Sequence, residues 1–238
     1  MAEFVSVLDA TWITILIYAG INVVGLVWSA GIIAVGIPAR MSIQGRHQKW
    51  ASLLERLPLI VFNQLTLIAV VWLAMSHLGH HLETSLPLLW VLVLQVFMIT
   101  FIDDAWFYAW HRLLHQNKGL YNRIHRIHHR AHAPLPIEYM YVHPLEWMVG
   151  SVGPALGLAA VAMAWGEVST WTLWGYLLTR NLHELDIHSG MRSPVGELIP
   201  LYASTEHHDL HHSRPTMGNY ASTFEVWDRL MKSFWRPQ

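Results

Sequence analysis

The stretch HRLLHQNKGLYNRIHRIHH, residues 111–129, carries five histidines in HxxxH and HxxHH spacing, and HDLHH, residues 208–212, repeats the second spacing. Residues three and four apart are neighbours on a helical surface. Each spacing is therefore predicted to place its imidazoles on one face of a helix. The three clusters comprise His111, His115, His125, His128, His129, His208, His211 and His212.

These eight histidines exceed what one ordinary zinc site can use, because such a site takes three or four protein ligands. The surplus indicates two metal ions, and imidazole-rich coordination suits iron in oxygen chemistry. The chain has no cysteine, which excludes thiolate ligands and a disulfide scaffold. A dimetal site built on histidine is the prediction.

The composition is that of a membrane protein. Hydrophobic residues make up 53% of the chain and charged residues only 13%, and 13 residues are Trp. The formal net charge is -1, so there is no electrostatic case for binding nucleic acid. Residues 11–37 include an essentially uncharged run that exceeds the roughly 20 residues needed to cross a bilayer.

Four further apolar runs follow, and the last of them is only marginally long enough to cross. It either extends or pairs with the fourth as a hairpin that does not fully cross. Gly150, Gly153 and Gly157 in the fourth run permit close helix packing. The sequence predicts an all-α, multi-pass membrane protein in which residues 1–238 form a single integral-membrane domain. The predicted spans are residues 11–37, 57–75, 86–110, 147–165 and 168–182.

The basic residues indicate an orientation. Residues 1–10, 76–85 and 166–168 contain no Lys or Arg, so five crossings would place all 15 basic residues on one side. The positive-inside tendency assigns that side to the cytoplasm. An even number of crossings would break this segregation. We therefore expect the N-terminus outside, with the catalytic parts, residues 103–144 and 181–238, forming a cytoplasmic helical cap over the spans.

A series of motifs resembles the fatty acid hydroxylase superfamily, which includes sterol desaturases, C4-methyl sterol oxidases and sphingolipid hydroxylases. In order, the motifs are HRLLH, LYNRIHRIHH, HPLE, NLHELDIHSG, HHDLHH and NYASTFEVWD, within roughly residues 100–230. The resemblance implies two Fe ions, O2 as cosubstrate, and hydroxylation or desaturation of a fatty acyl, sterol or related lipid. It also implies an external electron donor, such as a ferredoxin or a cytochrome-b5-type protein.

The resemblance further implies that His183 and His188 belong to the ligand set, which makes about ten histidines for two irons. Five positions separate these two residues, so they would point about 140° apart on a regular helix. One of them must therefore lie at a helix end or after a distortion. Ser189 and Gly190 mark a plausible terminus.

The other histidines are interpreted as non-ligands. His77, His80 and His81 reproduce the HxxHH spacing but fall in the loop predicted to lie outside, where Gly79 weakens a helix. His47 is expected to be solvated. His132 is expected at the surface or behind a ligand. His143 is expected near the site, and His207 is expected beside His208, which the HxxHH spacing favours as the ligand; whether His143 or His207 contacts metal stays open.

Ligating histidines usually donate their second ring N–H to a carboxylate or a carbonyl. Asp104 is the strongest candidate, because it lies two helical turns before His111 on the same face; the alternative is an interfacial charge at a helix end. Glu184, inside the NLHELDIHSG motif, is the second candidate for a carboxylate that accepts from a ligating histidine. The full set of nearby acids is Asp103, Asp104, Glu138, Glu146, Glu184, Asp186, Glu206 and Asp209.

Two other functions use clustered histidines in a membrane protein. A membrane zinc hydrolase or protease would use HExxH, but after His183 and Glu184 the next histidine, His188, comes one position late. A metal transporter would need metal-ligating side chains within the spans. The polar side chains in the predicted spans are mainly Asn63, Gln64 and Gln95. No retrieval signal for the endoplasmic reticulum is evident in SFWRPQ, so a bacterial inner membrane is expected rather than the endoplasmic reticulum.

Overall fold

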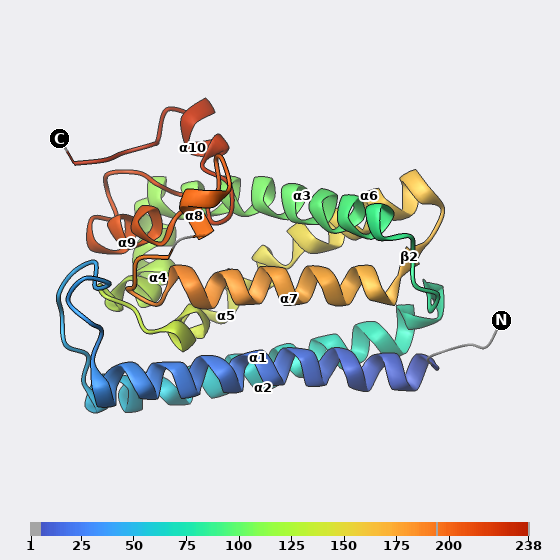
Figure 1. Ribbon diagram of the computed structural model, residues 1–238, viewed down its shortest axis with the longest axis horizontal. Coiled ribbons are helices and arrows are strands. Elements are labelled where there is room, and N and C mark those ends of the chain that lie inside the picture. The colour runs from blue at the N-terminus through green and yellow to red at the C-terminus, as the bar shows by residue number, and fades with distance from the viewer. Residues whose placement is uncertain (1–5, 194, 238) are drawn as a thin grey trace.

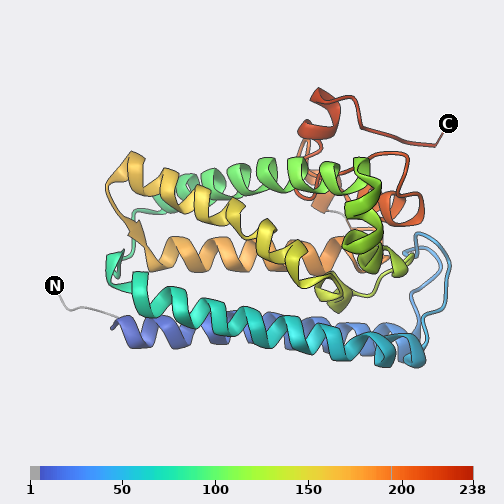
Figure 2. The ribbon, with the colours of Figure 1, turned by 180° about the vertical axis from the view of Figure 1, so that it is seen from behind.

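The computed structural model describes residues 6–193 and 195–237. Long helices lie side by side in this part of the chain and extend between the two ends of the molecule (Figures 1 and 2). Helices α1, α3 and α7 run in one direction and α2 and α6 in the other, so successive long helices are antiparallel (Figure 1). Their bounds are α1 Val7–Val35, α2 Trp50–Leu78, α3 Leu89–Gln116, α6 Val152–Trp165 and α7 Thr170–Ile187.

Four helical stretches of the described residues are long and apolar enough to cross a membrane. They overlap the first four predicted spans, and the predicted all-α membrane fold is confirmed. Helix α7 differs from them because its second half carries Arg180 and Glu184 and because it packs against α1 and α3 in the bundle. The number of crossings stays a prediction. The four stretches are Leu8–Val35, Trp50–His81, Leu89–Gln116 and Pro144–Trp165.

Helices α3 and α6 make the closest long contact, and two glycines allow it. A Cβ added at Gly157 would lie 2.9 Å from the Cα of Ile99, and one at Gly153 would lie 3.0 Å from the Cα of Asp103. The expectation for Gly150 does not hold: no described atom lies within 4 Å of a Cβ built there. It ends the short helix α5, Pro144–Gly150, one turn before the contact begins.

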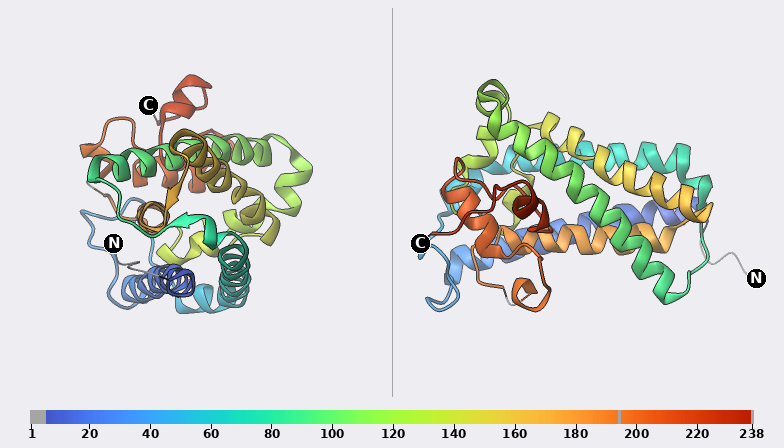
Figure 3. Two further views of the ribbon diagram at one scale, coloured as in Figure 1. Left: turned by 90° about the vertical axis from the view of Figure 1, so that its right-hand side faces the viewer. Right: turned by 90° about the horizontal axis from the view of Figure 1, so that it is seen from above.

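The short elements separate into two ends of the bundle (Figures 1 and 3). At one end, β1 pairs in parallel with β2, next to the 3-10 helix η1 that contains His80 and His81. The three histidine clusters lie at the opposite end. The elements of the first end are η1 Gly79–His81, β1 Leu82–Glu83 and β2 Val168–Ser169; those of the other are α4 Lys118–Arg123, η2 His125–Arg130, η3 Pro136–Met140, α8 Val195–Leu198, α9 Thr205–Ser213 and α10 Val226–Leu230.

A hydrophobic cluster fixes the chain that follows η2. Ile137 and Met140 of η3 pack with Ile32 of α1 and Ile60 of α2, all of them buried. The side-chain amide of Asn63 donates to the carbonyls on either side of Tyr141, at 2.9 Å and 2.8 Å. The polar side chain in the second span thus holds the loop that lies beneath the histidines.

Candidate metal centre

The first two clusters meet because α3 ends and the chain reverses within a few residues. Asn117 caps the next helix, α4, with its side-chain oxygen accepting from the amides of Gly119 and Leu120 at 2.9 Å and 3.1 Å. A turn at Asn117 thus precedes α4. It brings η2 back against the last turns of α3, so that His125 faces His111 with 3.0 Å between their Nε2 atoms.

The third cluster lies on the short helix α9. Ser204 caps this helix by accepting from the amide of His207 at 3.2 Å, as expected of an N-cap serine. His208 and His212 are one helical turn apart, and their Nε2 atoms lie 3.1 Å from each other. The Nε2 atom of His211 instead lies 3.1 Å from that of His129 on η2.

The described histidines form two groups in which one ring nitrogen per residue lies within 4.8 Å of the others. Each HxxHH motif is divided between the groups: its first and last histidines join one group and its middle histidine joins the other. The sequence predicted a shared helix face, and the structure adds this division. The five-histidine group is His111, His115, His125, His129 and His211; the four-histidine group is His128, His188, His208 and His212.

The spacing of these nitrogens fits ligand shells around metal ions. Neighbouring Nε2 atoms lie 2.9 Å to 3.4 Å apart in the two groups. Metal–nitrogen bonds of about 2.0–2.1 Å would give edges of about 2.9 Å in an octahedron and about 3.4 Å in a tetrahedron. Facing lone pairs repel at this distance unless a cation or a proton lies between them. The donor set, nine imidazoles without a thiolate, suits iron or zinc.

Outward-facing ring nitrogens in the five-histidine group donate mainly to main-chain carbonyls. His111 Nδ1 donates to Tyr220 O at 2.6 Å, and His211 Nδ1 donates to Gly218 O at 2.9 Å. His125 Nδ1 lies 2.8 Å from a carboxylate oxygen of Glu146. Since a carbonyl can only accept, the proton lies on Nδ1 and the Nε2 lone pair points inward.

The four-histidine group is oriented by different parts of the chain. His212 Nδ1 donates to Ala131 O at 3.0 Å, and His188 Nδ1 donates to Glu184 O at 2.8 Å. His128 Nδ1 has a longer contact, 3.4 Å, with Tyr141 O. The two groups therefore rest on separate supports, although they share η2 and α9.

The imidazoles outside the membrane-spanning helices are held neutral. Burial, together with the nearby imidazoles of His188 and His111, lowers the pKa of His128 to about 3. Burial also keeps the pKa values of His125, His129, His208, His211 and His212 well below 6.5. Neutral imidazole is the form that binds metal, so no proton must leave these rings at neutral pH.

His183, which the resemblance placed among the ligands, lies in neither group. It lies inside α7, whereas His188 is the C-cap residue of that helix. This agrees with the expectation that one of the two histidines lies at a helix end. Both ring nitrogens of His183 have other partners: the Tyr202 hydroxyl at 2.5 Å and Ser222 O at 2.8 Å. The helix therefore directs His183 toward Tyr202 and the segment around Ser222.

Of the two named carboxylates, Glu184 contacts a grouped histidine and Asp104 does not. Glu184 Oε2 lies 3.5 Å from His188 Nδ1, and the same carboxylate binds Arg180. Asp104 accepts from the amides of Thr223 and Phe224 at 2.8 Å and 2.9 Å. Seven residues of helix place it about 10 Å from His111 along the axis, which is too far for contact.

The remaining acids also differ from the sequence expectation. Only Glu146 and Glu184 of the eight contact a histidine of the two groups in the described hydrogen bonds and ion pairs. Asp103 binds Tyr176 and Arg180 within the bundle, and Asp209 binds Gln44. Glu138 pairs with Arg56, Glu206 pairs with Arg192 at the surface, and Asp186 lies on α7.

The histidines interpreted as non-ligands lie outside both groups among the described residues. His207 is buried, and its Nε2 atom lies 3.0 Å from Asp228. His143 caps α5 by accepting from the amide of Leu145 at 3.2 Å. Sequence reasoning missed Asp228; the signal for it was the EVWD end of the last quoted motif, to which no role was given.

The fold and site define a class: integral-membrane helical proteins with clustered histidines that could hold metal at one end of the bundle. The chain belongs to the fatty acid hydroxylase family, whose model matches residues 96–233. The resemblance inferred from the motifs is thereby confirmed.

Curated relatives agree with this assignment. The chain is 37% identical over 148 residues to methylsterol monooxygenase 1 of Gallus gallus, covering 61% of this chain and 48% of that protein. It is 41% identical over 131 residues to methylsterol monooxygenase 1 of Rattus norvegicus, covering 54% and 42% respectively. A very-long-chain aldehyde decarbonylase, GL1-10 of Oryza sativa subsp. japonica, is 32% identical over 179 residues, covering 74% and 57%. The chain thus spans about half the length of the curated relatives it matches, and no solved structure matches it.

Proposed function

We propose that the protein is a membrane-bound di-iron oxygenase that hydroxylates or desaturates an aliphatic lipid. The observation that carries this proposal is the pair of imidazole groups, whose nitrogen spacings match metal–ligand shells. Nine of the ten histidines expected from the sequence are the proposed ligands, and His183 is proposed to position its neighbours. Bound iron would supply the oxidation of an unactivated C–H bond by O2, with two electrons from an external donor such as a ferredoxin or a cytochrome-b5-type protein.

The residues of the chain support such chemistry in three ways. Nδ1–H bonds to carbonyls keep the inward lone pairs aimed at common centres. Burial of the rings excludes water, which protects oxidising chemistry from side reactions. Glu146 accepts from the ring of His125, and Glu184 places negative charge beside His188, which offsets the positive charge of ions held by neutral ligands.

The substrate proposed is a lipid that enters from the bilayer. Sterols, in particular a C4-methyl sterol, are the first substrates to test, because two of the relatives named above are methylsterol monooxygenases. A fatty acyl chain is the second, in keeping with the family.

One experiment separates this function from the zinc hydrolase and the metal transporter. Purified protein should bind close to two metal ions per chain and, with iron, a reductant and O2, consume oxygen only when the lipid is present. His128→Ala and His211→Ala each remove a proposed ligand from a different group and should abolish oxygen consumption. His80→Ala, at the opposite end of the bundle, should leave it unchanged. One zinc per chain with ester or peptide cleavage would overturn the proposal.

We propose that the histidine end of the bundle faces the cytoplasm, in a bacterial inner membrane, because the loops rich in Lys and Arg are at that end. The chain has no cysteine, so single cysteines report sidedness cleanly. A membrane-impermeant maleimide should label Ser85→Cys and Glu167→Cys in intact cells. It should label His47→Cys and Thr216→Cys only after permeabilisation. The reverse pattern would contradict the sidedness, labelling of both pairs from one side would contradict five crossings, and cell fractionation tests the inner-membrane location.

A further inference from the structure

Residues 215–222 form a segment, called here the carbonyl segment, that orients three members of the five-histidine group. Gly218 O accepts from His211 and Tyr220 O accepts from His111. The main-chain carbonyl of Pro215 accepts a hydrogen bond from the His115 ring. The four-histidine group is oriented by Ala131, Tyr141 and Glu184 instead. A displacement of the carbonyl segment would therefore disturb the orientation of the five-histidine group and leave the four-histidine group in place.

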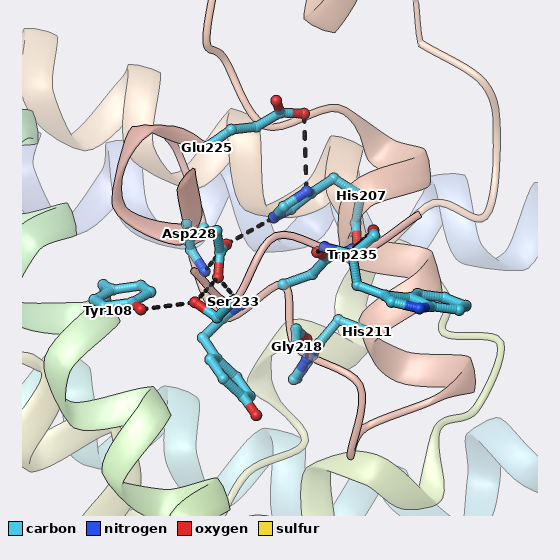
Figure 4. Close-up of polar contacts among 12 residues, drawn as sticks. Tyr108, His207, His211, Gly218, Glu225, Asp228, Ser233 and Trp235 are labelled. Atoms are coloured by element: carbon cyan, nitrogen blue, oxygen red, sulfur yellow. Dashed lines mark hydrogen bonds and ion pairs between the residues drawn. The ribbon is translucent and has the colours of Figure 1, made fainter. Parts of the chain in front are cut away.

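The carboxylate of Asp228 holds this segment in place. Its Oδ1 accepts from the Tyr220 amide and its Oδ2 from the Ala221 amide, both at 2.9 Å. Ser233 Oγ donates to Oδ1 at 2.7 Å, and the Tyr108 hydroxyl contacts that Oγ at 2.7 Å (Figure 4). Asp228 is fully buried, with 0% of its surface exposed. Four donors, including His207, converge on its two oxygens.

The backbone of the carbonyl segment depends on this anchoring. Gly218 has φ 130°, and a Cβ at this position would collide with the carbonyl oxygen of Ser233. Asn219 has φ 61°, a left-handed conformation that asparagine tolerates better than most residues. Its side chain bonds both the amide and the carbonyl of Trp235, at 2.7 Å and 3.0 Å. The turn that directs the carbonyls of Gly218 and Tyr220 toward histidines is thus held by bonds to Trp235, near the C-terminus.

We propose, resting on the metal-binding function proposed above, that Asp228 is a positioning residue for the metal ion of the five-histidine group. By fixing the amides of Tyr220 and Ala221, it fixes the carbonyls that orient His111 and His211. Its loss selectively weakens one of the two metal sites. Asp104 acts in the same direction from α3, because it holds two amides a little further along the chain, those of Thr223 and Phe224.

The loop that orients the four-histidine group allows the converse test, in which the other metal site is weakened. Glu138 accepts from the Leu135 amide at 3.0 Å and pairs with Arg56 at 2.5 Å. Arg56 also donates to Arg130 O at 3.0 Å. These bonds fix the loop that supplies the carbonyls of Ala131 and Tyr141. Glu138→Gln should therefore weaken the site that Asp228→Asn leaves intact.

The test is a metal titration of the full-length protein, stripped of metal and then titrated with Co²⁺, with the bound metal counted per chain. Asp228→Asn places an amide NH2 against main-chain donors and should weaken one of two sites about 10–100-fold. In a His211→Ala background, which already lacks that site, Asp228→Asn should change nothing further. In a His128→Ala background it should remove the remaining strong site.

Two controls separate this role from general folding. Glu206→Gln removes a surface ion pair with Arg192, leaves every bond to Asp228 in place, and should bind two ions as the parent does. Asp9→Asn weakens the exposed cap of α1 at the far end and should also bind two. Asp228→Asn with two unweakened sites would overturn the inference, as would equal loss of both sites. Absence of metal binding by the unmodified protein would instead overturn the proposed function.

Discussion

Glu146 is the carboxylate with the most direct contact with a proposed metal ligand. Its Oε1 receives the Nδ1–H of His125 at 2.8 Å, and its Oε2 has no partner among the described residues. A carboxylate behind a ligating histidine raises ligand basicity, and its loss typically costs 10–100-fold in metal affinity. Glu146→Leu should weaken one site by this factor. Glu146→Gln, which keeps an acceptor without the charge, should weaken it less.

The measurement is the dissociation constant of Co²⁺ for each variant. Glu206→Gln is the matched control, because Glu206 pairs with Arg192 at the surface and exposed pairs contribute little. Unchanged affinity in Glu146→Leu would contradict the assigned role.

At this scale the sequence predicted the grouped histidines better than the groups that orient them. Histidine spacing is a local property, so eight of the nine grouped histidines followed from it directly. The partners are mostly main-chain carbonyls from distant residues, such as Gly218 and Tyr220, and a carbonyl leaves no signature in a sequence. Asp104 lies on the same helix face as His111, but a shared face does not bring two residues close along the helix axis.

Close packing of α3 against α6 depends on Gly157 at the element scale. A Cβ there would lie 2.9 Å from Ile99 Cα and 3.0 Å from Ile99 O, and backbone atoms cannot move aside as a side chain can. Gly157→Ala should force the helices apart and lower stability by about 1–3 kcal/mol. Because α3 carries His111 and His115, metal affinity should fall as well.

The check is the thermal unfolding midpoint in detergent, with Gly20→Ala as the control. Gly20 lies inside α1, and no described atom lies within 4 Å of a Cβ built there. Alanine should stabilise that helix by up to about 1 kcal/mol. A Gly157→Ala midpoint equal to that of Gly20→Ala would contradict the packing argument.

The elements were predictable where hydropathy is continuous and less so where it is mixed. The first four spans have uniform apolar runs, so their helices appear as expected. Helix α7 combines apolar residues with Arg180 and Glu184, which are tolerated because Arg180 pairs with Asp103 of α3 at 3.0 Å. Such pairing across helices is a tertiary property. The division of each HxxHH motif between two groups has the same origin, since it depends on how η2 and α9 face each other.

For the whole molecule, the histidine end makes the metal-free protein sensitive to acid. The unfolded chain binds protons on these histidines near pH 6.5. The folded state holds the pKa of His128 near 3 and those of His125, His129, His208, His211 and His212 well below 6.5, because burial disfavours the charged form. Between about pH 3 and 6.5 the unfolded state therefore binds more protons. Stability is full above pH 6.5 and falls as the pH decreases.

The thermal unfolding midpoint of metal-free protein in detergent should therefore fall between pH 7.5 and pH 5.5. At one unit below 6.5, each such histidine contributes a loss of up to about 1.4 kcal/mol. His128→Gln combined with His212→Gln removes two of the titrating groups and should show a smaller decrease over the same range. Saturating metal should shift the decrease to lower pH, because ions compete with protons for the same nitrogens. A midpoint that does not change between the two pH values would show that these rings are not held neutral by burial.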